Sequence, residues 1–137
     1  MAIVNVQKKS RQSDFSDLDL DFFAHPITKD VVKRKGLDAI ARSIRNLVFL
    51  NFYDKPFQHE IGSNARKLLF ENLNVMTANM LRDAIIQVIQ NYEPRADVID
   101  VIVKADLDNN GYTAQVQFRP VNTLEPQLLS LFLERIR

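Results

Sequence analysis

Cysteine and tryptophan are both absent from this 137-residue sequence, and glycine occurs only three times. Without cysteine the chain has no disulfide and no thiolate ligand, which fits a reducing compartment. Its glycines (Gly36, Gly62 and Gly111) stand alone, so no glycine-rich loop is available to bind phosphate. A Gly-x-Ser-x-Gly elbow is also missing, which leaves covalent acyl chemistry without support. We therefore expect no cofactor, no bound metal and no catalytic residue.

Net charge and long apolar runs are lacking as well. The 18 basic and 17 acidic residues leave a formal charge of +1, too small to attract nucleic acid or an anionic membrane. No uncharged run approaches the roughly 20 residues of a membrane span. The apolar start at residues 2–4 is too short for a signal peptide. We expect one domain over residues 1–137, made in the cytosol.

The first 35 residues show no helical or strand periodicity, and we expect them to be irregular. Residues 1–15 form either a flexible arm or a short strand built on Ile3, Val4 and Val6. The His25-Pro26 step disfavours helix at His25.

Apolar spacing then predicts three helices. The first covers residues 37–51, where apolar residues recur every three or four positions. Ser63 can cap a short helix over residues 64–71. Thr77 can cap a longer helix that Pro94 ends. The buried face of the longer helix should comprise Leu81, Ala84, Ile85, Val88, Ile89 and Tyr92.

The period changes after residue 97. Residues 98–105 are rich in β-branched side chains, and residues 112–118 alternate apolar and polar, as in a half-buried strand. Residues 108–111 (Asp-Asn-Asn-Gly) predict a hairpin turn between them. Residues 129–133 alternate too, although a helical spacing also fits there. The prediction is an α+β fold, with about three helices packed on one face of a small antiparallel sheet.

Several motifs that could carry chemistry have ordinary explanations. Residues 106–111 match the first half of a calcium loop, but Gln117 stands where the bidentate glutamate belongs, so we interpret them as a turn. Neither His25 nor His59 has a second ligand at a metal-site spacing. A glycoside hydrolase needs two facing carboxylates. Candidates are available, but any domain of this size offers them: Glu60, Glu71, Glu93 and Asp97.

The triplet Glu93-Pro94-Arg95 has two interpretations. On physical grounds alone, a helix stop flanked by two exposed charges is the commoner one, because exposed charge pairs are frequent and contribute little. In the alternative, proline holds the two charges at a rigid corner where a partner docks.

The order of segments along the chain carries a resemblance. It starts with Asp19-x-Asp21-Phe22-x-x-His25-Pro26-x-Thr28-x-Asp30-Val31 and continues with Ala39-Ile40-x-x-Ser43-Ile44-x-Asn46-Leu47. Further segments are Pro56-Phe57-x-x-Glu60-Ile61-Gly62-Ser63, Leu68-Leu69-Phe70-Glu71 and Tyr92-Glu93-Pro94-Arg95-Ala96-x-Val98. Together, over about residues 15–120, they resemble the small baseplate wedge family of T4-type contractile-tailed phages. That family has a counterpart in the bacterial type VI secretion baseplate.

The resemblance implies a structural protein of the virion tail baseplate, assembled in the host cytoplasm. It implies contacts with the wedge core-bundle proteins through Glu93, Pro94 and Arg95. It also implies a sheet that accepts arms of the first ring of tail sheath subunits by strand addition, near tail tube or hub proteins. Some members carry a lysozyme label. A tail-associated peptidoglycan hydrolase and a type VI secretion component therefore stand as the alternatives.

Overall fold

The computed structural model describes residues 15–19, 21–123 and 125–135. The predicted N-terminal arm therefore lies outside the described residues, apart from Phe15. Eight elements follow one another along the chain: β1 (Ser16–Leu18), β2 (Lys33–Lys35), α1 (Leu37–Phe49), α2 (Ala65–Leu68), α3 (Val75–Tyr92), β3 (Ala96–Asp106), β4 (Gly111–Pro120) and β5 (Gln127–Glu134).

The two long helices form where the apolar spacing predicts them. On α1, the residues at three- and four-residue intervals are buried, among them Ile40, Ile44 and Val48. The helix α3 ends at Tyr92, before Pro94, as expected. Its start differs from the prediction, because Asn74 and not Thr77 is the capping residue. The Asn74 side chain accepts a hydrogen bond from the Thr77 backbone N–H at 2.7 Å.

The short helix α2 is shorter than the predicted span of residues 64–71. Ser63 nevertheless organises its start, since the Ser63 hydroxyl accepts a hydrogen bond from the Ala65 N–H at 3.2 Å. The same hydroxyl donates to the Val48 carbonyl at 2.6 Å. Ser63 thus ties α2 to the end of α1.

Three antiparallel strands form the main sheet, in the order β3-β4-β5. The predicted turn connects β3 to β4, with Asn110 at a φ of 49°. The segment after residue 126 is a strand, paired with β4, and not a helix. Its alternating pattern, and not the helical spacing, corresponds to the structure, because one face of the sheet is buried and the other is exposed. The buried side chains of β4 and β5 include Tyr112, Ala114, Val116, Phe118, Leu131 and Leu133.

The first 35 residues are not irregular throughout, which corrects the prediction. Strands β1 and β2 pair antiparallel in a second, two-stranded sheet, here called the N-terminal hairpin. The pattern escaped sequence analysis because each strand has only three residues and neither has a buried apolar face. The predicted α+β class is confirmed, but with two sheets instead of one.

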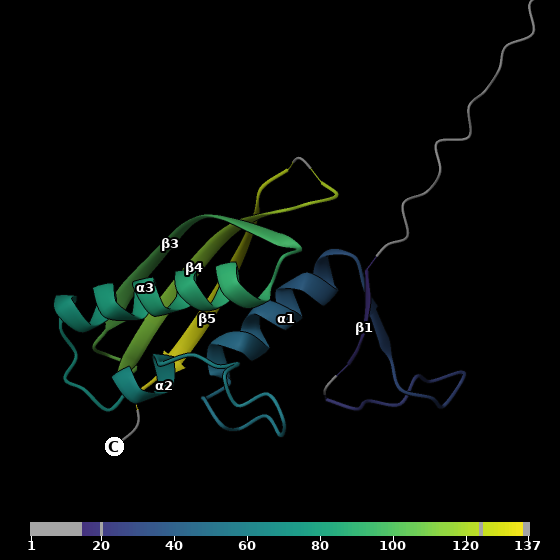
Figure 1. Ribbon diagram of the computed structural model, residues 1–137, viewed down its shortest axis with the longest axis horizontal. Coiled ribbons are helices and arrows are strands. Elements are labelled where there is room, and N and C mark those ends of the chain that lie inside the picture. The colour runs from purple at the N-terminus through teal and green to yellow at the C-terminus, as the bar shows by residue number, and fades with distance from the viewer. Residues whose placement is uncertain (1–14, 20, 124, 136–137) are drawn as a thin grey trace, which may run out of the picture.

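The layers are visible in Figure 1, where α1 and α3 lie over the same face of the three-stranded sheet. The N-terminal hairpin lies beyond α1, away from that sheet. Of the helices that the structure describes, none is long and apolar enough to cross a membrane.

Candidate functional site

The Glu93-Pro94-Arg95 triplet lies where α3 passes into β3. The Glu93 N–H donates to the Ile89 carbonyl and closes the last turn of α3, while the Glu93 carbonyl accepts from the Ala96 N–H. Pro94 between them is exposed. The triplet is therefore a tight corner whose backbone is fixed on both sides.

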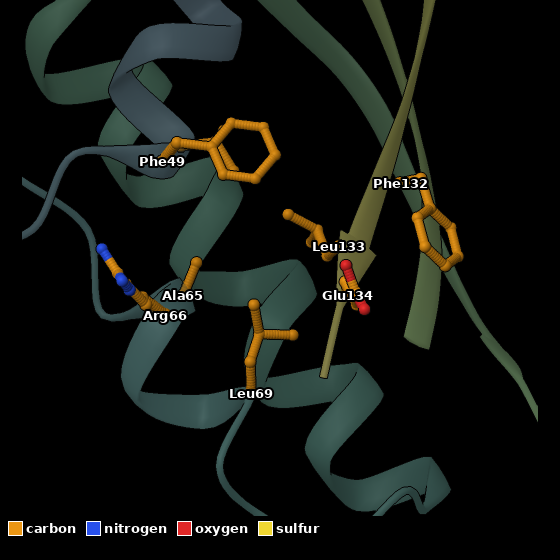
Figure 2. A pocket seen from close by; sticks show the side chains of 8 residues that line it. Phe49, Ala65, Arg66, Leu69, Phe132, Leu133 and Glu134 are labelled. Carbon is orange, nitrogen blue, oxygen red and sulfur yellow. The ribbon is translucent and has the colours of Figure 1, made fainter. Parts of the chain in front are cut away.

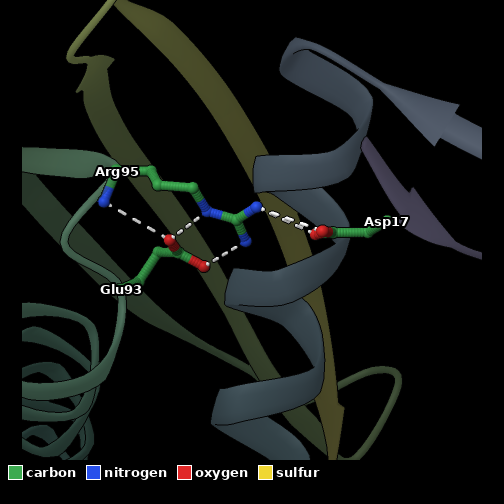
Figure 3. A network of polar contacts seen from close by, with 3 residues as sticks. All are labelled: Asp17, Glu93 and Arg95. Atoms are coloured by element: carbon green, nitrogen blue, oxygen red, sulfur yellow. Dashed lines mark hydrogen bonds and ion pairs between the residues drawn. The ribbon is translucent and has the colours of Figure 1, made fainter. Parts of the chain in front are cut away.

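Glu93 and Arg95 bind each other through two parallel hydrogen bonds (Figure 3). The Arg95 Nε lies 2.7 Å from Glu93 Oε1, and Nη2 lies 2.9 Å from Oε2. This fork is the strongest geometry open to a guanidinium and a carboxylate. Glu93 is only 2% exposed, so the pair is largely withdrawn from water on the glutamate side.

A third charged residue, Asp17 of β1, completes the cluster. Arg95 Nη1 lies 3.2 and 3.0 Å from the two carboxylate oxygens of Asp17. The Arg95 guanidinium also stacks over the Phe15 ring, 5.4 Å from its centre. Arg95 thus joins the N-terminal hairpin to the α3–β3 corner. Asp17 was not a candidate in the sequence, because nothing local connects residues 78 positions apart.

Burial and hydrogen bonding oppose each other at Glu93. Burial by itself raises the pKa of the Glu93 carboxyl, but hydrogen bonds from Arg95 and Ser43 outweigh it and hold the pKa below its usual value. Hydrogen bonding to Glu93, followed by contact with Asp17, raises the pKa of Arg95. Both groups are therefore charged at neutral pH.

The expectation that Glu93 and Arg95 are accessible charges is wrong for Glu93. Its side chain is buried, and the Arg95 side chain is 22% exposed. Of the three residues, only Pro94 is exposed. The corner is thus a structural element in the free chain, whatever it contacts in an assembly.

The other chemical candidates are not brought together by the fold. Asp106 accepts hydrogen bonds from the Asn109 N–H at 3.1 Å and from its side-chain amide at 2.8 Å, which closes the β3–β4 turn. His25 Nδ1 accepts from two backbone N–H groups in its own loop, and His59 stacks on Tyr53. Within residues 15–19, 21–123 and 125–135, no three His, Cys, Asp or Glu side chains gather in a metal site.

The hydrolase candidates are dispersed in the same way. Asp97 pairs with Arg119 at 2.7 Å on the sheet, and Glu93 is held by Arg95. In five of the clefts on the described part of the chain, the lining includes at most one carboxylate. A glycosidase acid also needs a raised pKa, whereas that of Glu93 is lowered.

A second surface of interest is the free edge of β5. The Arg135 N–H donates to the Asn110 carbonyl, which fixes the alternation of the β4–β5 ladder. By that alternation, the backbone N–H and C=O groups of Leu128, Ser130 and Phe132 point outward, away from β4. β5 therefore offers a row of backbone groups that no other strand among the described residues uses.

Next to this edge lies an apolar cleft of about 390 Å³ (Figure 2). The Phe49 and Leu133 side chains face one another across it, Leu69 lies at its base, and Arg66 and Glu134 lie at its rim. No local sequence pattern predicts this cleft, since its walls come from three separate elements, α1, α2 and β5.

The opposite edge of the sheet, along β3, is partly closed by side chains. Val101 has its N–H bound to the Asp100 carboxylate at 2.8 Å, and its carbonyl bound to Arg82 Nε at 3.0 Å. The β3–β4 register also shifts between Val98 and Asp100. Bulges and charged side chains of this kind discourage strand addition.

Known proteins share this fold. A chain of the anti-feeding prophage baseplate is 18% identical with a TM-score of 0.63, over 90% of this chain and 88% of that one. A chain of the postcontracted pyocin R2 baseplate is 15% identical with a TM-score of 0.55, over 86% and 98%. A putative tail lysozyme from Geobacter sulfurreducens is 17% identical with a TM-score of 0.60, over 72% and 92%. At these identities the likeness concerns the fold alone.

Sequence similarity is more specific. The baseplate wedge protein gp25 of Enterobacteria phage T4 is 29% identical over 108 residues, covering 79% of this chain and 81% of that protein. Residues 34–121 match the family described as baseplate wedge protein gp25, and this range contains α1, α3 and the Glu93–Arg95 corner. The chain therefore belongs to the baseplate wedge protein gp25 family.

Proposed function

We propose that this chain is a non-catalytic assembly subunit that docks onto other wedge proteins and seeds the first ring of the tail sheath. Membership of the gp25 family makes it a structural component of a phage tail baseplate. The observation that carries the finer proposal is the asymmetric sheet, with side chains on the β3 edge and free backbone groups on the β5 edge.

Seeding the sheath requires a place where a foreign strand can pair. Strand addition takes main-chain hydrogen bonds from the edge and specificity from pockets for alternate side chains. On β5 the outward backbone groups provide the main-chain hydrogen bonds. The cleft between Phe49 and Leu133 provides an apolar pocket for a side chain of the added strand. An arm of the sheath subunit is the strand that we assign to this edge.

Docking onto the wedge core bundle is assigned to the Glu93-Pro94-Arg95 corner. Its support is the rigid presentation of Pro94, exposed between two residues that hydrogen bonds fix in place. Proline has little conformational freedom left to lose on binding, which favours association.

A proline at Ser130 tests the sheath assignment. The Ser130 N–H points outward by the register, so Ser130→Pro removes an edge donor without breaking the β4–β5 ladder. The variant should fold and join wedges, but it should fail to start sheath polymerisation. Ala105→Pro is the matched control. By the β3–β4 register, the N–H of the exposed residue Ala105 also points outward, but on the β3 edge. Equal sheath assembly by both variants would contradict the assignment.

The docking assignment is tested by placing a carboxylate on the corner. Pro94→Asp should leave the melting temperature nearly unchanged and abolish co-purification with the other wedge proteins. Asn79→Asp adds the same charge at an exposed position near the other end of α3 and should co-purify normally. Co-purification of both variants would assign docking to another surface.

The hydrolase alternative predicts that the purified chain cleaves peptidoglycan. We expect no cleavage above a blank by turbidity assay. Activity that disappears in a Glu60→Gln, Glu71→Gln or Glu93→Gln variant would replace the structural proposal with an enzymatic one.

A further inference from the structure

A cleft of about 420 Å³, with charged and polar residues among those that line it, lies between β1 and α1 and beside the Glu93–Arg95 corner. Two of its lining residues also belong to the corner. Asp17 binds Arg95 Nη1, and Ser43 is one of the groups that lower the pKa of Glu93. The lining comprises Ser16, Asp17, Leu18, Ala39, Arg42, Ser43 and Asn46. The cleft therefore adjoins the corner, and the Asp17 carboxylate lies between the two.

The N–H groups of the Arg95 guanidinium bind two different partners. Glu93 takes Nε and Nη2, and this pair is buried on the glutamate side. Asp17 takes Nη1, and its own side chain is 39% exposed. Glu93 is thus a permanent neighbour of Arg95, whereas Asp17 approaches from the solvent side and from a separate sheet. A carboxylate arriving from outside would meet Arg95 where Asp17 now lies.

The element that carries Asp17 is held weakly. The β1–β2 ladder of the N-terminal hairpin has three paired positions, extended by an Ala24–Val31 bridge and a few loop hydrogen bonds, and two-stranded ribbons of this kind are marginally stable by themselves. Among its described residues only Asp19 is buried, so little apolar contact fixes it, apart from Phe15. Its other ties to the body are ionic, since Arg42 of α1 binds both Asp19, at 3.3 Å, and Asp21. Elements with few buried apolar contacts open at low free-energy cost.

We propose that the N-terminal hairpin is a gate over Arg95, and that the β1–α1 cleft binds a carboxylate side chain of a partner wedge protein in place of Asp17. The partner's chemistry follows from the occupant already there, a carboxylate on an extended segment, and from the two arginines, Arg42 and Arg95, that the opened cleft presents. In the closed state Asp17 competes with that carboxylate. This proposal rests on the proposed docking function of the corner, and it adds the regulation of that site.

Opening can be measured without any partner. The chain has no cysteine, so single cysteines at Ile27, in the loop between β1 and β2, and at Lys104 on β3 allow specific spin labelling. In the wild type, distances between the labels should show a dominant closed population and a minor open one. Asp17→Asn should raise the open population roughly fivefold, because a partly exposed ion pair contributes up to about 1 kcal/mol. Asp17→Glu should restore the closed population.

Asp97→Asn is the matched control, since Asp97 also pairs with an arginine but lies outside the cluster. It should leave the distances unchanged. Asp17→Asn should also bind the purified wedge proteins of the same tail roughly fivefold more tightly, as a lost competitor requires. Unchanged distances, or weaker binding by Asp17→Asn, would overturn the gate. If the wild-type chain binds no wedge protein at all, the proposed docking fails, while the distances still decide whether the hairpin opens.

Discussion

Replacing Arg95 with alanine tests most directly whether Glu93 is a buried carboxylate that Arg95 stabilises. The substitution removes both fork hydrogen bonds from Glu93, at 2.7 and 2.9 Å, and leaves a carboxyl group that is 2% exposed. Removing one partner of a buried pair is strongly destabilising, by about 3–5 kcal/mol, because the other charge stays buried and unpaired.

The carboxyl group can limit this loss by taking up a proton. For a glutamate with its usual pKa of about 4.5, protonation near pH 7 costs about 3.4 kcal/mol. We therefore expect Arg95→Ala to lower the free energy of unfolding by about 3 kcal/mol at neutral pH. In a chain of this length, that lowers the melting temperature by roughly 10 °C.

The pH dependence supplies the sharper criterion. In the wild type the pKa of Glu93 is lowered on folding, so the pair stabilises above the unfolded-state pKa and its contribution disappears as pH falls through the folded-state value. In Arg95→Ala burial dominates and raises the folded-state pKa. The free energy of unfolding of the variant should therefore rise as the pH falls from about 7 to about 5. In the wild type, the Glu93–Arg95 pair gives no such rise over this range.

Urea unfolding at several pH values measures both effects. Arg119→Ala is the matched control, because Arg119 pairs with Asp97 at 2.7 Å but both side chains are about half exposed. It should cost less than about 1 kcal/mol. If Arg95→Ala loses no more than the control and shows no reversed pH slope, Glu93 is not the buried, paired group described here.

Three further results are expected. Tyr112→Phe should cost about 1 kcal/mol in urea unfolding, because the Tyr112 hydroxyl accepts the Asn74 N–H at 3.2 Å, and an unchanged stability would argue against that bond. Gly62→Ala should cost about 1–3 kcal/mol, since the added Cβ would lie 2.5 Å from the Phe52 nitrogen; a neutral effect would mean that this loop can shift. Titration calorimetry should show no micromolar calcium site, and a site abolished by Asp108→Asn would restore the calcium interpretation of the turn.

Sequence periodicity predicted the long helices and the three-stranded sheet, because burial of one face requires apolar residues at regular spacing. The alternation of residues 112–118 corresponds to β4, whose apolar side chains face the helices, and the spacing on α1 marks its buried stripe. The turn residues placed the β3–β4 hairpin correctly. These features are local, so a single sequence contains the information that specifies them.

What the sequence did not predict depends on distant contacts. The triplet was recognised, but the burial of Glu93 follows from the packing of α3, β3 and α1 around it, and the Asp17 contact follows from a hairpin with no hydrophobic pattern. Thr77 was predicted as the cap, but Asn74, three residues earlier, is a capping type as well. Only the hydrogen bond from the Thr77 N–H to the Asn74 side chain decides between them.

The two edges of the sheet differ in a way that suits a seed for polymerisation. A subunit with two free edges could add strands on both sides, or pair with itself, and unprotected edges are a common route to aggregation. Here Arg82 and Asp100 occupy the outward backbone groups of Val101 on one edge, while no strand of the described part of the chain pairs with the outer edge of β5. In the proposed seeding role, this asymmetry would restrict growth to the β5 side. Arg82→Ala combined with Asp100→Ala should consequently leave sheath seeding intact but increase self-association, which light scattering would detect. A scattering mass equal to that of the wild type would show that the register shift alone protects the β3 edge.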